Sequence, residues 1–183
     1  FDDGLADAPA VKKAAARALE IAPDIDVLVN NAGIALNEPL LEATVENWDM
    51  TQAVNLRAPF LMAQAIVPQM IRRGAGKIVN VSSQTSQLAL QDHGAYAASK
   101  NGLNALTKVM TIGWAKHNIQ CNAVLPTVIL TPMGEMVWGK PEKGDPMKAR
   151  IPQGRFGSTT EVADVVLFLS TTASDMVNGE TVL

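Results

Sequence analysis

Residues 77–126 read KIVNVSSQTSQLALQDHGAYAASKNGLNALTKVMTIGWAKHNIQCNAVLP, which is one complete alternation of strand, helix and strand. Lys77–Val81 is a short apolar run that ends at two serines. Gly94–His117 has the length of a long helix, and Ile119–Leu125 is a second apolar run, stopped by Pro126. Because parallel strands need a long crossover connection, two short apolar runs joined by such a helix predict a parallel βαβ unit.

The same alternation continues on both sides of this stretch. We expect an Ala-rich helix and then a buried strand before it, and a helix and then a strand after it. We therefore expect a Rossmann-type α/β fold, which is a doubly wound parallel sheet with helices on both faces, in one domain over residues 1–183. The first expected helix covers Ala8–Leu19, with Asp7 as its N-cap and Pro9 in its first turn, and a strand over Ile25–Val29 follows it. A long helix is expected from Thr44 to Ile71, kinked at Pro59 and Pro68 and ended by Gly74 and Gly76. Near the end of the sequence we expect a helix over Glu161–Leu169 and a strand from Glu180 to Leu183.

Composition excludes several classes of protein. Hydrophobic residues make up 48% of the 183, which is a globular composition and not a disordered one. The net charge of -3 gives no basic surplus, so we expect no nucleic-acid partner and no membrane partner. A single cysteine excludes an internal disulfide and a Cys-rich metal site, and we expect no metal. No apolar run reaches the ~18 residues of a membrane span and no leader is recognisable, so the expected location is cytoplasmic.

Parallel sheets bind ligands beyond the carboxyl ends of their strands, which here means after Val29, Val81 and Leu125. Asn30–Gly33 follows the first of these ends, and its small residues would let a flat ligand approach the backbone, although taken alone they favour an ordinary turn. Pro126–Pro132 follows the third, with two threonines that suit either a cofactor contact or a plain connection.

The second strand end carries the most chemistry. Tyr96 and Lys100 lie four residues apart, on one face of the predicted helix, downstream of Ser82 and Ser83. A nearby ammonium stabilises a phenolate, and a serine hydroxyl beside it can hold a carbonyl oxygen. Together these groups could move a proton to or from that oxygen. A surface Tyr–Lys pair on a helix is the alternative.

These motifs in this order resemble the short-chain dehydrogenase/reductase family. The matching positions are Asn30-Asn31-Ala32-Gly33, Asn55, Ser83, Tyr96-Ala97-Ala98-Ser99-Lys100, the Pro126 loop, Gly154-Arg155-Phe156-Gly157, Glu161-Val162-Ala163 and Gly179-Glu180-Thr181. Within the family the chain is similar to the L-xylulose reductase (dicarbonyl or carbonyl reductase) and polyol dehydrogenase branch. That branch is indicated by Val79–Gln84, Leu106–Met110, Asn122–Val128, Thr131–Gly134 followed by Trp138, Arg150–Phe156 and His93.

The resemblance implies an NAD(P)-dependent oxidoreductase that reduces a ketose or dicarbonyl to an alcohol, or oxidises a sugar alcohol. Tyr96 would be the general acid and base, Lys100 would lower its pKa and bind the nicotinamide ribose, and Ser83 would hold the substrate oxygen. Asn55 would anchor a water in the proton relay. The cofactor contacts implied are Asn31, Ala32, Gly33, Tyr96, Lys100, Ile129 and Thr131. NADP(H) is favoured by the branch, and NAD(H) is the alternative.

Substrate contacts implied by the resemblance are Ser83, Gln84, His93 and Trp138. His93 would otherwise be a loop residue, and Trp138 a packing or interface residue. Polar Gln84 and His93 suit a hydroxylated substrate better than a 3-oxoacyl thioester, whose reduction is the alternative activity. A small-molecule carbonyl or alcohol is therefore the expected partner, together with a second copy of the chain in a homotetramer or homodimer.

The sequence departs from the family at its start. Neither Gly-x-x-x-Gly-x-Gly nor Gly-x-Gly-x-x-Gly occurs in the 183 residues, so a phosphate-binding turn is not among them. We expect the chain to correspond to the C-terminal two-thirds to three-quarters of the family's domain, without its N-terminal strands, and to leave Ile25–Val29 as an unpaired sheet edge. The sequence is then either trimmed, or a non-catalytic fragment that keeps only the oligomer interface of helices 44–71 and 94–117.

Overall fold

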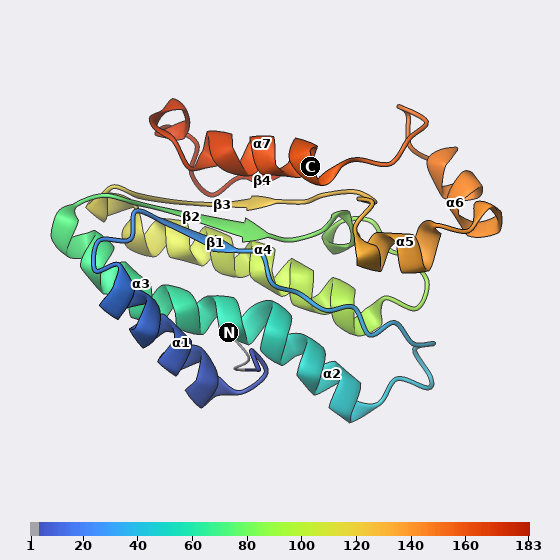
Figure 1. Cartoon of the computed structure of the whole chain (residues 1–183), viewed down its shortest axis with the longest axis horizontal. Coiled ribbons are helices and arrows are strands. Elements are labelled where there is room, and N and C mark those ends of the chain that lie inside the picture. The colour runs from blue at the N-terminus through green and yellow to red at the C-terminus, as the bar shows by residue number, and fades with distance from the viewer. Residues whose placement is uncertain (1–3) are drawn as a thin grey trace.

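The computed structural model describes residues 4–183, and its centre is a parallel sheet of four strands in the order β1-β2-β3-β4. Figure 1 shows α1, α3 and α4 on one side of the sheet and α7 on the other, so helices cover both faces as expected. The strands are β1 (Val27–Asn30), β2 (Gly76–Val81), β3 (Ile119–Val124) and β4 (Thr181–Val182).

The helices follow the sequence pattern over most of the chain. Asp7 caps α1 and Thr44 caps α2, each accepting from a backbone N–H of the first turn. Gly74 ends α3 in the left-handed conformation, with φ of 72°. The α-helices are α1 (Ala8–Ile21), α2 (Val45–Gln52), α3 (Ala58–Arg73), α4 (Gly94–Trp114), α5 (Pro132–Trp138), α6 (Pro141–Lys148) and α7 (Thr159–Leu169), with a π-helix η1 (Ala53–Arg57) and 3-10 turns η2 (Gln84–Ser86), η3 (Ala115–His117) and η4 (Thr172–Ser174).

Two stretches differ from the sequence-based expectation. The helix expected from Thr44 to Ile71 is three consecutive pieces, α2, η1 and α3, and the π-helix η1 stands where a plain kink was expected. The loop expected over Pro126–Pro132 leads into α5 and α6, two helices that the sequence pattern did not predict. Both of these helices have proline in the first turn, where its missing N–H would be unpaired anyway.

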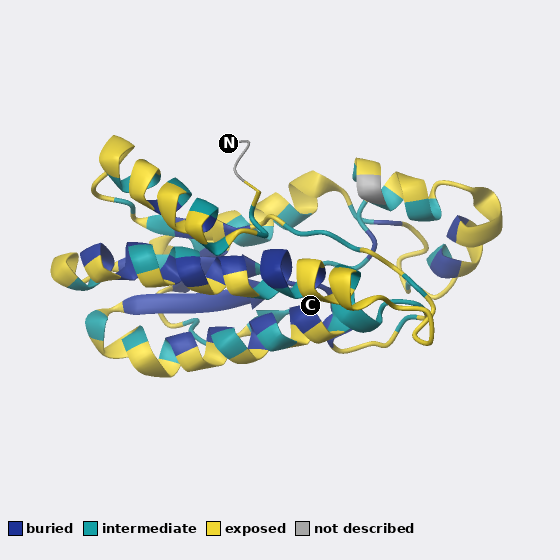
Figure 2. Cartoon of the chain, turned by 90° about the horizontal axis from the view of Figure 1, so that it is seen from below, coloured by how far each residue is buried: buried dark blue, intermediate teal, exposed yellow. Residues whose placement is uncertain are grey.

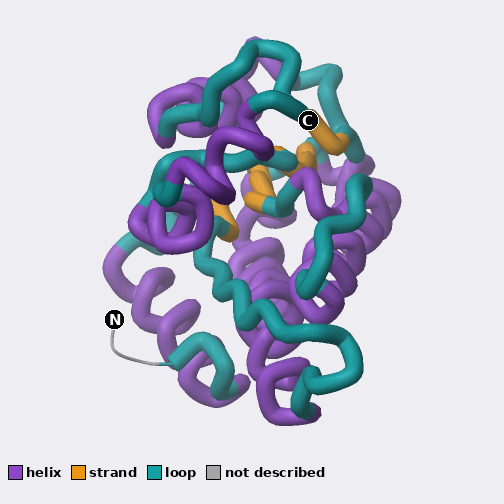
Figure 3. Tube along the Cα trace, turned by 90° about the vertical axis from the view of Figure 1, so that its right-hand side faces the viewer, coloured by secondary structure: helices purple, strands orange, loops and turns teal. Residues whose placement is uncertain are grey.

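The core lies between the sheet and the helices. Figure 2 shows the sheet buried between helices whose outer faces are exposed, and Figure 3 shows the strands enclosed by helices when the molecule is viewed from its side. The largest apolar cluster joins β1, β2 and β3 to α3 and α4. A smaller cluster packs α7 on the opposite face of the sheet, against Val79 and Val124.

A buried polar chain ties two strands to α4. Asn30 donates its amide to Asn80 Oδ1 at 2.8 Å, and Asn80 donates in turn to Thr107 Oγ1 at 2.9 Å. Thr107 completes the chain by donating to the carbonyl of Leu103. Because buried amides need partners, this chain fixes how the ends of β1 and β2 lie against the helix.

β1 lies at the edge of the described sheet and pairs only with β2. Val29 in this strand is partly exposed, as expected for an edge. Among residues 4–183, no helix has both the length and the apolar content needed to cross a membrane.

Candidate active site

A cavity of about 400 Å³ opens at the carboxyl ends of β1, β2 and β3, where the parallel topology predicts a ligand site. The loops after the three strands, the start of α4 and the helix α5 line it. Ten of the residues expected in a site line this cavity, namely Asn31, Gly33, Ser83, Gln84, His93, Tyr96, Lys100, Ile129, Thr131 and Trp138.

Two expected residues lie elsewhere. Ala32, expected as a cofactor contact, instead lines a separate groove beside α1 and α3. Asn31 and Gly33, on either side of Ala32, both line the cavity, and Asn31 borders the groove as well. Asn55 is fully buried beneath the cavity floor and does not line it.

Tyr96 and Lys100 stand one turn apart on α4 as the spacing predicts. The Lys100 Nζ atom lies 5.7 Å from the centre of the Tyr96 ring. Lys100 is 3% exposed, and its ammonium donates to the carbonyl of Val81 at 2.8 Å. Ser82 donates its hydroxyl to the carbonyl of Lys100, which ties the end of β2 to this turn of the helix.

Burial controls the ionisation of both groups. Burial raises the pKa of Tyr96, and a hydrogen bond from Ser83 opposes this by favouring the phenolate. Burial lowers the pKa of Lys100 to about 8, because a desolvated ammonium is costly. The expectation that Lys100 lowers the pKa of Tyr96 stays a prediction, since burial is the largest cause here and acts in the opposite direction.

Asn55 occupies the π-helix η1 and connects it to the cavity wall. Its Oδ1 accepts the backbone N–H of Ile34, and its Nδ2 donates to the Ile34 carbonyl, both at 2.9 Å. Nδ2 also lies 3.1 Å from the hydroxyl of Ser99. Residue 59 is proline and cannot donate to the Asn55 carbonyl, as residue i+4 of an α-helix would. A π-helix here gives Asn55 this unusual backbone, which is common at functional sites.

Gly33 marks a place where the cavity wall must stay thin. A Cβ atom at this position would stand 3.2 Å from Lys100 Nζ and 3.4 Å from Asn55 Oδ1. The missing side chain leaves the Lys100 ammonium open to the cavity beside a flat stretch of backbone. Such a cradle fits the ribose and nicotinamide end of a dinucleotide, for which Asn31, Ile129 and Thr131 supply the remaining walls.

Asn37 is a cavity residue that the sequence did not single out. Its Nδ2 lies 3.1 Å from His93 Nε2, while His93 Nδ1 lies 2.6 Å from the Gln91 carbonyl. Because a carbonyl oxygen only accepts, Nδ1 carries the ring proton and Nε2 accepts from Asn37. The Asn37 Oδ1 atom is then left to accept a hydroxyl in the cavity. Only the folded loop brings these residues together, since they lie far apart in the sequence.

Trp138 combines a place in the cavity wall with apolar packing, and its contact with substrate stays a prediction. It lies at the end of α5, lines the cavity, and packs against the apolar cluster of Val128, Met147 and Phe156.

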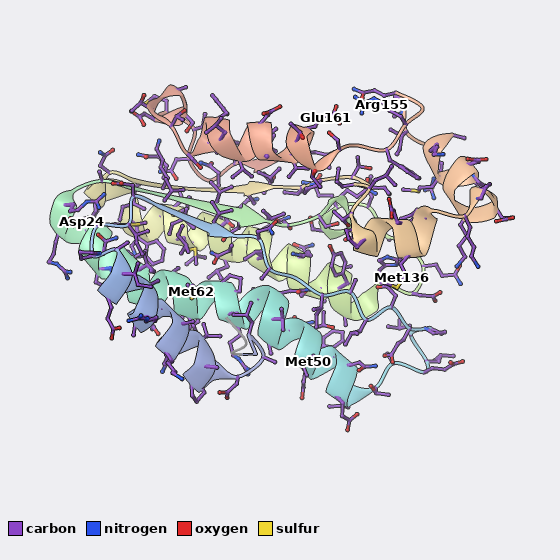
Figure 4. All side chains as sticks on the ribbon, viewed as in Figure 1. Asp24, Met50, Met62, Met136, Arg155 and Glu161 are labelled. Atoms are coloured by element: carbon purple, nitrogen blue, oxygen red, sulfur yellow. The ribbon has the colours of Figure 1, made fainter. Side chains whose placement is uncertain are left out.

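The loop before α7 is fixed by Arg155, whose guanidinium forms a two-pronged ion pair with Glu161 (Figure 4). The Arg155 guanidinium lowers the pKa of the Glu161 carboxyl to about 2. No group of three His, Cys, Asp or Glu side chains that could hold a metal occurs among residues 4–183.

Comparison with known proteins connects this geometry to a family. Residues 5–183 match the family model described as enoyl-(acyl carrier protein) reductase. The chain is 48% identical to L-xylulose reductase from Bos taurus over 86% of its own length and 65% of the relative's. It is 44% identical to NAD-dependent glycerol dehydrogenase from Listeria innocua, over 94% of the chain and 68% of that protein.

A solved structure matches almost the whole chain in fold. It is a gluconate 5-dehydrogenase from Burkholderia cenocepacia in complex with NADP and tartrate, with a TM-score of 0.93 and 36% identity. The match covers 98% of this chain and 70% of that one. The chain therefore spans about two-thirds of the length of the proteins that it resembles.

Proposed function

The chain belongs to the short-chain dehydrogenase/reductase family, whose members here are NAD(P)-dependent oxidoreductases, and from that premise we propose that it interconverts a hydroxylated ketone and its alcohol. The proposed substrates are ketoses or dicarbonyls in reduction and sugar alcohols in oxidation. The observation that carries the proposal is the convergence of Ser83, Tyr96 and Lys100 on one cavity at the carboxyl ends of the strands.

The proton chemistry follows from these three residues. In reduction, the Tyr96 hydroxyl donates its proton to the carbonyl oxygen as that oxygen becomes an alcohol. The Ser83 hydroxyl holds the same oxygen by a hydrogen bond. In oxidation the roles reverse, and the Tyr96 phenolate takes the proton. The nicotinamide, when bound, supplies or accepts the hydride.

Lys100 and Asn55 would support this proton exchange without touching the reacting oxygen. The Lys100 ammonium, open to the cavity beside Gly33, would bind the ribose hydroxyls and stabilise the phenolate. Asn55, in the π-helix, would hold a water that passes protons from Lys100 to solvent.

NADP(H) is the cofactor we propose first, because the gluconate 5-dehydrogenase of similar structure holds NADP. NAD(H) is the alternative, since the glycerol dehydrogenase relative is NAD-dependent.

The polar side of the cavity supports a hydroxylated substrate. Gln84 and His93 line it, and Asn37 leaves an amide oxygen free to accept a substrate hydroxyl. Trp138 closes the side toward α5. The relatives named above act, by their names, on a ketose and a polyol. We place this chemistry in the cytoplasm, a reducing compartment with which a single buried cysteine is compatible.

Steady-state assays test the proposal directly. The purified protein is given NADPH or NADH with L-xylulose, diacetyl or an acetoacetyl thioester, and NADP⁺ or NAD⁺ with xylitol and glycerol. We expect turnover of the ketose or dicarbonyl, and a fall of about 10²- to 10⁴-fold in kcat for Tyr96→Phe. Faster turnover of the thioester than of every ketose would assign the 3-oxoacyl reductase activity instead. No turnover with any pair would contradict the proposal.

A further inference from the structure

Ser83 is the N-cap of the 3-10 turn η2 and accepts two hydrogen bonds from one residue. Its backbone is extended, and its Oγ accepts the backbone N–H of Thr85 at 3.2 Å. The Thr85 hydroxyl also donates to Ser83 Oγ, at 2.9 Å. Thr85 is 6% exposed, and among residues 4–183 its hydroxyl has no other hydrogen-bond partner. The Thr85 hydroxyl, which also borders the cavity, therefore has Ser83 Oγ as its one protein partner among these residues.

The two bonds restrict what Ser83 can do. A serine hydroxyl has one proton to donate and two lone pairs that accept. Thr85 occupies both acceptor positions of Ser83 Oγ. The remaining proton must point away from Thr85, toward Tyr96 and the cavity that both residues line. Ser83 can then donate to Tyr96 or to a substrate oxygen, and cannot accept from either.

We propose that Thr85 is a positioning residue that fixes Ser83 as an obligatory hydrogen-bond donor in the cavity. The inference deepens the proposed function, because a donor is what a carbonyl oxygen or a forming alkoxide requires. It also sets the direction of the bond to Tyr96. A neutral Tyr96 cannot donate to Ser83 Oγ, since both lone pairs there are taken, so the Ser83–Tyr96 bond favours the phenolate.

Removal of the Thr85 hydroxyl tests this. Thr85→Val keeps the backbone N–H bond and opens one lone pair of Ser83 Oγ, which neutral Tyr96 can then use as an acceptor. That bond favours the protonated phenol, so the pKa of Tyr96 is expected to rise by about half to one unit in this variant. Thr85→Ser restores the hydroxyl and is expected to titrate like the wild type. Thr111→Val is the matched control, since it also removes a threonine hydroxyl from the fold but lies outside the cavity.

Tyr96 can be titrated directly, because it is the only tyrosine in the 183 residues. Ultraviolet difference absorbance of the phenolate is followed against pH, and Tyr96→Phe provides the background. Turnover is measured in parallel. Thr85→Val is expected to lower kcat about five- to tenfold, with little change in the KM for the nicotinamide. Should Thr85→Val fold poorly, Thr85→Ala removes the same hydroxyl.

The outcomes separate this inference from the proposed function. If the wild type turns over ketoses and Thr85→Val titrates unchanged, the role of Thr85 is overturned while the proposed function stands. If the phenolate titration shifts as expected but no nicotinamide-dependent turnover exists, the role of Thr85 stands and the proposed function fails. A loss of activity that Thr85→Ser does not rescue would indicate a merely structural threonine and overturn the inference.

Discussion

Lys100 is a buried cation whose ionisation couples the site to the stability of the fold. Burial lowers its pKa to about 8, against 10.5 for an ordinary lysine. Between these two pH values the unfolded chain binds a proton that the folded chain lacks. The free energy of unfolding therefore gains a contribution as pH rises from about 8 to 10.5. Burial raises the pKa of the Cys121 thiol to about 12, and by the same reasoning this thiol costs stability above pH 9.

Lys100→Met separates the two effects. We expect the difference in unfolding free energy between wild type and Lys100→Met to move in favour of the wild type by about 3 kcal/mol between pH 8 and 10.5. The variant keeps Cys121, so the contribution of the thiol cancels in this difference. Urea denaturation at a series of pH values measures it. Parallel pH profiles for the two proteins would show that Lys100 keeps an ordinary pKa in the fold.

The sequence predicted which polar residues meet at the cavity better than it predicted the residues that hold them. Ser83, Tyr96 and Lys100 follow strand ends or lie one helical turn apart, which are relations that can be read from spacing. Thr85 and Asn37 act through contacts that exist only in the folded loops. A threonine near a serine has no signature by itself, because the backbone turn of η2 decides whether their hydroxyls meet.

The elements were predicted where their patterns are regular. Gly94–Trp114 and the strands beside it follow from periodicity and length, and the cap of α1 follows from Asp7 and Pro9. The π-helix η1 did not follow, since its hydrogen bonds depend on Pro59 and on the packing of Asn55 in the core. Short helices such as α5 also escaped, because proline suggests both a loop and the first turn of a helix.

The amide chain between β1, β2 and α4 gives a prediction at the level of elements. Asn80→Leu leaves the buried amide of Asn30 without its acceptor, and we expect it to cost about 2 kcal/mol of unfolding free energy. Replacing both partners removes the unpaired group, so Asn30→Leu/Asn80→Leu should be less destabilised than the sum of the single variants. Denaturant unfolding of the four proteins completes the double-mutant cycle. Additive costs would show that the two amides do not stabilise each other.

At the scale of the molecule, the alternation of short apolar runs with long helices was enough to predict the parallel sheet. The order β1-β2-β3-β4 and helices on both faces confirm that prediction. Every residue of β3 is buried, as expected for a central strand of a parallel sheet with helices on both faces. The edge position of β1 also agrees with the expected open edge.

The outer faces of α2, α3 and α4 expose apolar side chains that a single chain does not cover. On α4, Val109 is 65% exposed and Ile112 is 84% exposed. Phe60 of α3 and Met50 of α2 line a groove on these helices, and Figure 4 shows where Met50 lies. Exposed apolar area of this kind marks interaction surfaces. The expected homo-oligomer would bury it, with these helices packed against a second copy of the chain.

A charge on this surface should therefore separate the copies. Burying an unpaired carboxylate is costly, so Val109→Asp and Ile112→Asp are expected to shift the protein toward smaller species in sedimentation velocity. Met176→Asp is the control, because Met176 is exposed as well but lies in the η4 region, outside these helices. If the interface supports the site, the two α4 variants lose activity in proportion to the smaller species. If the wild type sediments as an oligomer and both variants keep its sedimentation coefficient, the contact between copies lies on another face, because a buried unpaired aspartate would weaken an interface made by these helices. A wild type that sediments as a monomer would contradict the expected homo-oligomer.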